Sequence, residues 1–140
     1  MIAWLVNHIA LALFNLANSR IDAYRILKNK SIAHGINFGC YALFAAGVGY
    51  FSIRHTTGIW CIIAEIGVLG LSAFCNRQFS FDIPLNRRRK LPWNYVSPAK
   101  PPKAILDQFE IRLFGYNGSA PFVMYAAIFI LMTVIKIIWL

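Results

Sequence analysis

Acidic side chains are scarce in this sequence of 140 residues, which has five Asp and Glu against 14 Lys and Arg. Charged residues of both signs make up 14% of the chain, whereas a soluble domain has about 25%. Hydrophobic residues make up 59%, and the mean hydropathy is +0.57. Because so few polar side chains cannot cover the core of a soluble domain, the composition favours a protein whose solvent is the lipid bilayer.

Cysteine is also scarce. Cys40, Cys61 and Cys75 all lie in apolar stretches, and no two of them form a C-x-x-C pair. An odd number of cysteines cannot close a complete set of disulfides. We therefore expect all three to be small buried side chains.

The sequence lacks the common catalytic and metal-binding motifs. It has no H-E-x-x-H, no G-x-S-x-G, no P-loop and no repeated Asp motif that could hold Mg²⁺ and pyrophosphate. Asp22, Asp82 and Asp107 are far apart, and no two of them have the spacing of metal ligands. We therefore predict no catalytic residue, no metal site and no cofactor.

Four apolar segments are long enough to cross a bilayer, which takes about 20 residues of helix. They cover roughly residues 1–19, 32–53, 56–75 and 119–140. The first segment has no basic n-region and no cleavage site of small residues, so we interpret it as a true span and not as a signal peptide. The predicted fold class is all-α: one polytopic membrane domain with four transmembrane helices.

The basic residues gather in two blocks, from Arg20 to Lys30 and from Arg77 to Arg112. Basic loops stay in the cytoplasm, so we expect the loop over residues 76–118 inside and both termini on the outer, periplasmic side. Anionic lipid headgroups are the expected partners of this loop, and nucleic acid is not. The residues expected to contact the headgroups are Arg87, Arg88, Arg89, Lys90 and Trp93.

A short amphipathic helix is predicted near the end of this loop. It would start after Pro101 and Pro102 and stop at Gly115, because proline suits a helix start and glycine a helix end. Its apolar residues recur at helical spacing. The helix would lie in the cytoplasmic interface of the membrane or dock under the bundle.

Small residues recur at steps of three and four along the second segment. Such spacing lets helix backbones approach closely and indicates a packing face. Whether the neighbouring helix belongs to the same chain or to another copy stays open. The residues of this face are Gly35, Gly39, Ala42, Ala46 and Gly49.

Glu65 is an isolated carboxylate in the middle of the third segment. An ionised carboxylate at mid-bilayer costs about 2.5–3.5 kcal/mol on insertion scales, so Glu65 should face protein. His8 and Glu65 each lie twelve residues before a flanking arginine, Arg20 and Arg77, which places them at the same depth. We hypothesise a His8–Glu65 pair. The alternative is a protonated Glu65 that donates to a backbone carbonyl or to Tyr41.

Polar residues also form one stripe along the first segment, at steps of three, four and seven. This stripe should face other helices or water, and with the start of the second segment it could line a polar vestibule. The residues involved are His8, Asn15, Asn18, Asp22, Arg25, His34 and Asn37. Three interpretations stay open: hydrogen bonding between helices, a proton or ion path through Glu65 and His8, and an enzyme site facing lipid headgroups.

Residues 81–115, "FDIPLNRRRKLPWNYVSPAKPPKAILDQFEIRLFG", and residues 19–38, "SRIDAYRILKNKSIAHGINF", resemble parts of small uncharacterised membrane proteins from bacterial and phage genomes. The resemblance implies insertion into a bacterial inner membrane and carries no activity. We expect a non-catalytic structural or partner-binding role, with self-association or a membrane protein as partner. The first alternative is a small channel, holin-like pore or proton-coupled transporter that uses Glu65, and the second is a lipid-acting enzyme.

Overall fold

The computed structural model of the chain describes residues 2–28, 30, 34–95, 105–115 and 118–139. Within these ranges the secondary structure consists of helices joined by turns and short irregular links, with no strand, so the predicted all-α class is confirmed. The elements are α1 (Ile2–Leu27), α2 (His34–Ile53), α3 (Ile59–Arg77), the π-helical turn η1 (Gln78–Asp82), α4 (Ile83–Arg88), α5 (Ile105–Phe114) and α6 (Ser119–Trp139).

Four helices of the described chain are long and apolar enough to cross a membrane, as predicted. Two of them extend well beyond their predicted ends. α1 continues past residue 19 to Leu27, and α3 continues through η1 and α4 to Arg88 as one helical stretch of 30 residues. At 1.5 Å per residue this stretch is about 45 Å long, whereas the hydrocarbon core is about 30 Å thick. The first part of the expected loop is therefore a helix, and this helix is long enough to project beyond the hydrocarbon core of the bilayer.

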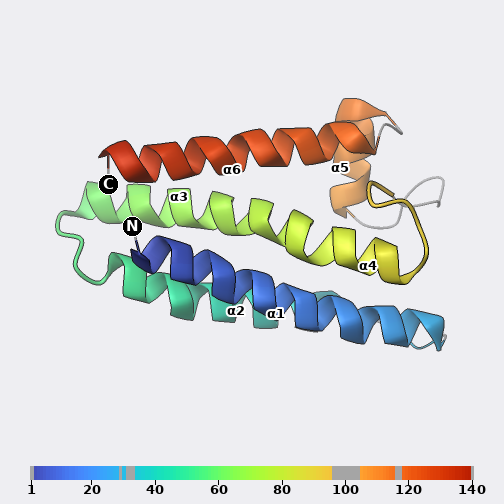
Figure 1. Cartoon of the computed structure of the whole chain (residues 1–140). Coiled ribbons are helices and arrows are strands. Elements are labelled where there is room, and N and C mark those ends of the chain that lie inside the picture. Colours follow the sequence, from blue (N-terminus) through green and yellow to red (C-terminus); the bar gives the residue numbers. More distant parts are fainter. Residues whose placement is uncertain (1, 29, 31–33, 96–104, 116–117, 140) are drawn as a thin grey trace.

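The four long helices lie side by side, with α3 between α6 and the pair formed by α1 and α2 (Figure 1). α1 begins and α6 ends at the same end of the bundle, which also holds the link from α2 to α3; we call this the terminal end. η1, α4 and α5 lie toward the opposite end, which we call the loop end, and there α5 crosses the beginning of α6 (Figure 1).

The side chains of α1 are distributed inversely to those of a helix in a soluble protein. Several of its apolar side chains, among them Ile2, Leu5 and Leu13, are more than half exposed, while Asn15 and Asp22 are each 1% exposed. A helix that turns its polar side inward and its apolar side outward is stable in lipid and not in water. Together with the four spans, this distribution fits a small integral membrane protein.

Two small apolar clusters complete the interior of the bundle. One joins Trp4, Val68 and Met132 from α1, α3 and α6. The other joins Leu11, Tyr41 and Ala73, and the Tyr41 hydroxyl donates to the Ala73 carbonyl at 2.6 Å. Because each cluster takes residues from three helices, the clusters fix the relative depth of those helices.

The π-helical turn η1 lies directly before Pro84. A proline inside a helix lacks the N–H that would bond to the carbonyl four residues earlier, here that of Ser80, and its ring crowds that carbonyl. A wider turn accommodates both effects without ending the helix. η1 packs against α1 and brings Gln78 and Phe81 into the buried interior.

The small-residue face of α2 packs closely against another helix of the same chain at one described position, Gly49. A methyl group on Gly49 would collide with the side chain of Leu69 on α3, so the two helices approach closely there. A methyl group on Gly39 would meet nothing within 4 Å, and Ala42 and Ala46 are exposed. Most of the predicted packing face is therefore uncovered. The surroundings of Gly35 lie outside what the structure describes.

Candidate functional site: a buried polar seam

The buried face of α1 carries five polar side chains, each of which bonds to another element or to its own helix. We call this set and its partners the polar seam. It runs nearly the whole length of α1. Its members on α1 are Asn7, His8, Asn15, Ser19 and Asp22, and their partners are Ser52, Asn76, Ser80, Arg88 and Asn37.

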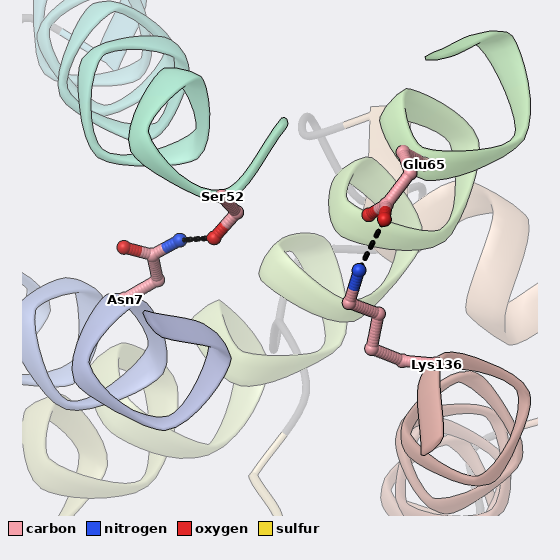
Figure 2. Close-up of polar contacts among 4 residues, drawn as sticks. All are labelled: Asn7, Ser52, Glu65 and Lys136. Carbon is pink, nitrogen blue, oxygen red and sulfur yellow. Dashed lines mark hydrogen bonds and ion pairs between the residues drawn. The ribbon is translucent and has the colours of Figure 1, made fainter. Parts of the chain in front are cut away.

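Toward the terminal end, two polar contacts lie between neighbouring helices (Figure 2). The Asn7 amide donates to the Ser52 hydroxyl between α1 and α2. The Lys136 ammonium of α6 forms an ion pair with Glu65 of α3, which is 3% exposed. The carboxylate that the sequence isolates in an apolar span is therefore neutralised by a cation from another span.

The predicted His8–Glu65 pair is wrong, because Glu65 binds Lys136 and His8 binds Asn76. The depth argument took Arg20 and Arg77 as the edge of the membrane for both helices. α1 and α3 each continue beyond these arginines, so equal distance from them does not give equal depth. The alternative of a Tyr41 partner is also wrong, because Tyr41 donates to a backbone carbonyl of α3.

His8 lies in the middle of the bundle between two aromatic rings. Its ring centroid is 4.4 Å from that of Trp4 and 5.1 Å from that of Phe129, both in edge-on geometry. The Asn76 amide donates to the backbone carbonyl of His8 at 2.9 Å and lies 3.2 Å from its Nδ1. The other ring nitrogen, Nε2, is buried without a hydrogen-bond partner among the described residues.

From Asn76 the hydrogen bonds continue toward the loop end. The Ser80 hydroxyl in η1 lies 2.7 Å from the Asn76 carbonyl and 3.0 Å from its side-chain oxygen. The Asn15 amide of α1 donates to Ser80 at 2.8 Å. His8, Asn76, Ser80 and Asn15 thus form one connected network, and it depends on the π-helical turn that carries Ser80.

At the loop end the polar seam acquires charge. Arg88 of α4 donates to the Ser19 hydroxyl, so this arginine turns into the bundle. One turn further along α1, both carboxylate oxygens of Asp22 accept from the Asn37 amide at 3.0 Å. Asp22 is 1% exposed, which makes it the most buried acidic side chain described.

Several predicted residues lie beside the polar seam and not in it. Asn18 and Arg25 are half-buried, and the side chain of His34 lies outside the described residues. Cys40 and Cys61 are exposed on the outer surface of the bundle, so the expectation that all three cysteines are buried is wrong for these two. Exposure to lipid suits a small apolar thiol as well as burial does.

The predicted headgroup residues divide into two groups. Arg87, Lys90 and Trp93 are exposed, and Trp93 packs edge-on against Phe122 at 5.4 Å. Arg88 and Arg89 instead make contacts within the chain, Arg88 to α1 and Arg89 at 6.0 Å from the ring of Tyr95.

Sequence reasoning missed Lys136 and Ser80 as parts of the interior. Lys136 lies near the end of an apolar span, where a lysine can reach the membrane interface, but its side chain is 12% exposed and turns to Glu65. A lone lysine and a lone glutamate in two different spans were a usable signal for this pair. Ser80 gave no such signal, because its position depends on the continuation of α3 beyond residue 75.

A groove of about 360 Å³ lies between α2 and α3 and opens on the outer surface. Small side chains from both helices form much of its wall. Leu43 on the neighbouring surface of α2 is 77% exposed and stands beside the groove as a ridge. The lining residues are Ala42, Ala45, Ala46, Gly49, Tyr50, Ile53, Ile66, Leu69, Gly70 and Ala73.

No protein-family model, curated protein or solved structure matches this chain. The described residues contain no group of three or more His, Cys, Asp and Glu that could hold a metal ion. The interior holds a column of hydrogen-bonding groups, the ring of His8 and the ion pair of Glu65 and Lys136. What the surface offers is the groove between α2 and α3.

Proposed function

We propose that the protein is a non-catalytic component of a bacterial inner membrane that associates with a second copy of itself through the groove between α2 and α3. The observation that carries this proposal is the uncovered small-residue face of α2, which meets α3 closely at Gly49 and leaves Ala42 and Ala46 open. Small residues at this spacing are the usual contact surface between transmembrane helices, because they let two backbones approach closely.

A second copy is the occupant that suits the geometry of this face. The groove and the Leu43 ridge lie side by side on α2. A two-fold axis exchanges the same patch between two subunits, so the ridge of one copy would enter the groove of the other. A straight helix packed in this way gains van der Waals contact along its length, which is the main source of affinity between helices in lipid.

We also propose that the loop end lies in the cytoplasm, where the exposed Arg87, Lys90 and Trp93 contact anionic headgroups. The basic residues around α4 belong to this end of the bundle (Figure 1). Positive loops are retained in the cytoplasm during insertion, and each Lys or Arg near an anionic surface contributes about 1 kcal/mol of attraction. Both termini would then lie on the periplasmic side.

Self-association can be tested with one glycine substitution in the groove and one beside it. Gly70 lines the groove, and a methyl group there meets nothing within 4 Å, so Gly70→Leu should fill the groove without disturbing the chain. We expect this variant, and Ala46→Leu on the opposite wall, to lose energy transfer between donor- and acceptor-labelled copies in liposomes. The measurement is transfer efficiency against protein-to-lipid ratio.

The matched control is Gly67→Leu, on the same helix and outside the groove, where a methyl group also meets nothing within 4 Å. It should associate like the wild type. Energy transfer in the wild type no greater than expected from random proximity would refute the proposal. So would equal transfer in Gly70→Leu and Gly67→Leu, because the groove would then play no part.

A further inference from the structure

We propose that the protein also transfers protons across the bilayer along the polar seam, with His8 and Glu65 as the proton-carrying groups on either side of a single apolar layer. The layer consists of Trp4, Val68 and Met132. This inference concerns the interior of one copy and is independent of association through the groove.

The order of residues along three helices places the apolar layer between the two ionisable positions. On α3, Glu65 comes one turn before Val68, on the terminal-end side. On α6, Lys136 comes one turn after Met132, on the same side. On α1, His8 comes one turn after Trp4, on the loop-end side. Each step of three or four residues is about 4.5–6 Å along the helix axis, so one layer of side chains separates the ion pair from the imidazole.

The surroundings of the His8 ring suit a group that exchanges a proton. The Asn76 amide donates to its backbone carbonyl and is placed to donate to Nδ1 as well, which leaves the proton of a neutral ring on Nε2. That nitrogen is buried and has no partner among the described residues. An unsatisfied buried N–H costs about 1–3 kcal/mol, so a purely structural side chain would be better replaced by an apolar one.

Hydrogen-bonding groups connect His8 to the loop end and run beside the second apolar cluster of Leu11, Tyr41 and Ala73. The connected network of Asn76, Ser80 and Asn15 adjoins His8, and Ser19 with Arg88, then Asp22 with Asn37, follow it along α1. The ionisable groups along this route and around it are Glu65, Lys136, Asp22, Arg88, Tyr41, Arg77, Cys75, Tyr125, Glu110 and Asp82. The layer of Trp4, Val68 and Met132 is the barrier to proton transfer between His8 and Glu65, and it acts as a gate that is closed in this structure.

The proposed step moves one proton and no other atom. The His8 imidazole takes a proton at Nδ1 from a hydronium ion that enters from the loop end, which leaves a water molecule, and becomes an imidazolium. The Asn76 side chain turns its oxygen toward the new N–H. When the layer opens and water enters, the imidazolium releases the proton to the Glu65 carboxylate, and the Lys136 ammonium leaves the pair for the nearby interface. Glu65 then releases the proton at the terminal end and recovers Lys136. Met132 is the flexible part of the layer, because its unbranched thioether has several accessible rotamers.

The test is proton flux into liposomes that enclose a pH-sensitive dye, with a membrane potential set by potassium and valinomycin. We expect the wild type to acidify the vesicles faster than protein-free lipid. His8→Gln and Glu65→Gln should reduce the flux to the level of protein-free lipid. Val68→Ser should raise it several-fold, because a hydroxyl in the layer lowers the barrier to water.

Each variant has a control of the same chemical type outside the polar seam. His55→Gln alters an exposed histidine in the link between α2 and α3, and Val123→Ser alters a valine of α6 that is 67% exposed. Both should conduct like the wild type. Because Glu65→Gln leaves Lys136 unpaired and could unfold the bundle, the double variant Glu65→Gln/Lys136→Met is measured as well, after its helix content and monodispersity are checked.

Vesicles with folded wild-type protein that stay as tight as protein-free lipid at every pH tested would overturn the proposal. Flux that persists in His8→Gln and in the double variant would overturn the assignment of the two groups. Potassium flux equal to proton flux would also overturn it, since a water-filled pore would then replace a proton relay. None of these outcomes depends on energy transfer between copies.

Discussion

At the scale of single residues, the Glu65–Lys136 pair makes a prediction about stability. Removing one member of a buried ion pair leaves a lone charge and costs about 3–5 kcal/mol, while replacing both members with neutral side chains is often neutral or stabilising. We therefore expect Lys136→Met alone to destabilise the protein strongly, and Glu65→Gln/Lys136→Met to restore most of the loss. The measurement is the free energy of unfolding in detergent micelles titrated with a denaturing detergent.

A matched comparison is the exposed pair of positions Ile63 and Ile130, on α3 and α6. Ile63→Val and Ile130→Val should each change the unfolding free energy little, because both side chains face lipid. A double variant at Glu65 and Lys136 that is less stable than Lys136→Met would contradict the expectation. The two side chains would then contribute contacts beyond their mutual charge.

The residue scale also shows what could be read from the sequence. The steps of three, four and seven identified His8, Asn15 and Asp22 as an inward face of α1, and all three are buried. The partners could not be identified, because hydropathy gives the depth of a residue only relative to an assumed edge. Lys136 shows the limit most clearly: a lysine near a helix end reaches water or a carboxylate, and only the packing of α6 on α3 decides which.

At the scale of elements, a buried hydrogen bond ties α5 to the bundle. The Tyr125 hydroxyl of α6 donates to the Glu110 carboxylate of α5 at 2.6 Å. Tyr125 is 2% exposed and Glu110 is 8% exposed, while Phe109 and Leu113 of the same helix are about half exposed. α5 therefore docks through its polar side and leaves apolar side chains outward, an arrangement that suits the membrane interface.

Removing this contact should release α5. A hydrogen bond to a charged group contributes about 1.5–3 kcal/mol, so Tyr125→Phe should increase the population in which α5 is undocked. We expect faster hydrogen exchange of the amides of Ile105–Phe114, with little change in α3. The measurement is hydrogen exchange followed by mass spectrometry in nanodiscs.

The control is Tyr24→Phe, which removes a hydroxyl from a tyrosine of α1 that is 58% exposed. It should leave the exchange of α5 unchanged. Unchanged exchange in Tyr125→Phe would contradict the expectation and would indicate that apolar contacts alone hold α5 in place.

Among the elements, the four spans and α5 were predictable, because each has a regular apolar pattern with turn residues at its ends. The extensions of α1 and α3 were not. Charged residues such as Arg20 and Arg77 mark where lipid contact ends, and a helix can continue beyond that point. The π-helical turn before Pro84 was also hidden, since proline in sequence usually indicates a helix end.

At the scale of the whole molecule, the interior is held by polar contacts and two small apolar clusters, while α2 is the least covered long helix. Lipid offers little hydrophobic drive between helices, so hydrogen bonds and close packing define which helices are neighbours. The polar seam ties α1 to α2, α3, η1 and α4 at five levels. The remaining open face of α2 is the part of the molecule most suited to a second subunit.

The orientation of the molecule makes the last prediction. The basic blocks flank the loop end, so the positive-inside rule predicts that this end lies in the cytoplasm and that the link between α2 and α3 lies outside. Thr57 and Lys90 are exposed at the two opposite ends of the bundle. In a background of Cys40→Ser and Cys61→Ser, we expect a membrane-impermeant maleimide to label Thr57→Cys in intact spheroplasts and to label Lys90→Cys only after lysis. The reverse pattern would mean the opposite orientation, and labelling of both positions from outside would contradict a bundle in which α3 crosses the membrane between them.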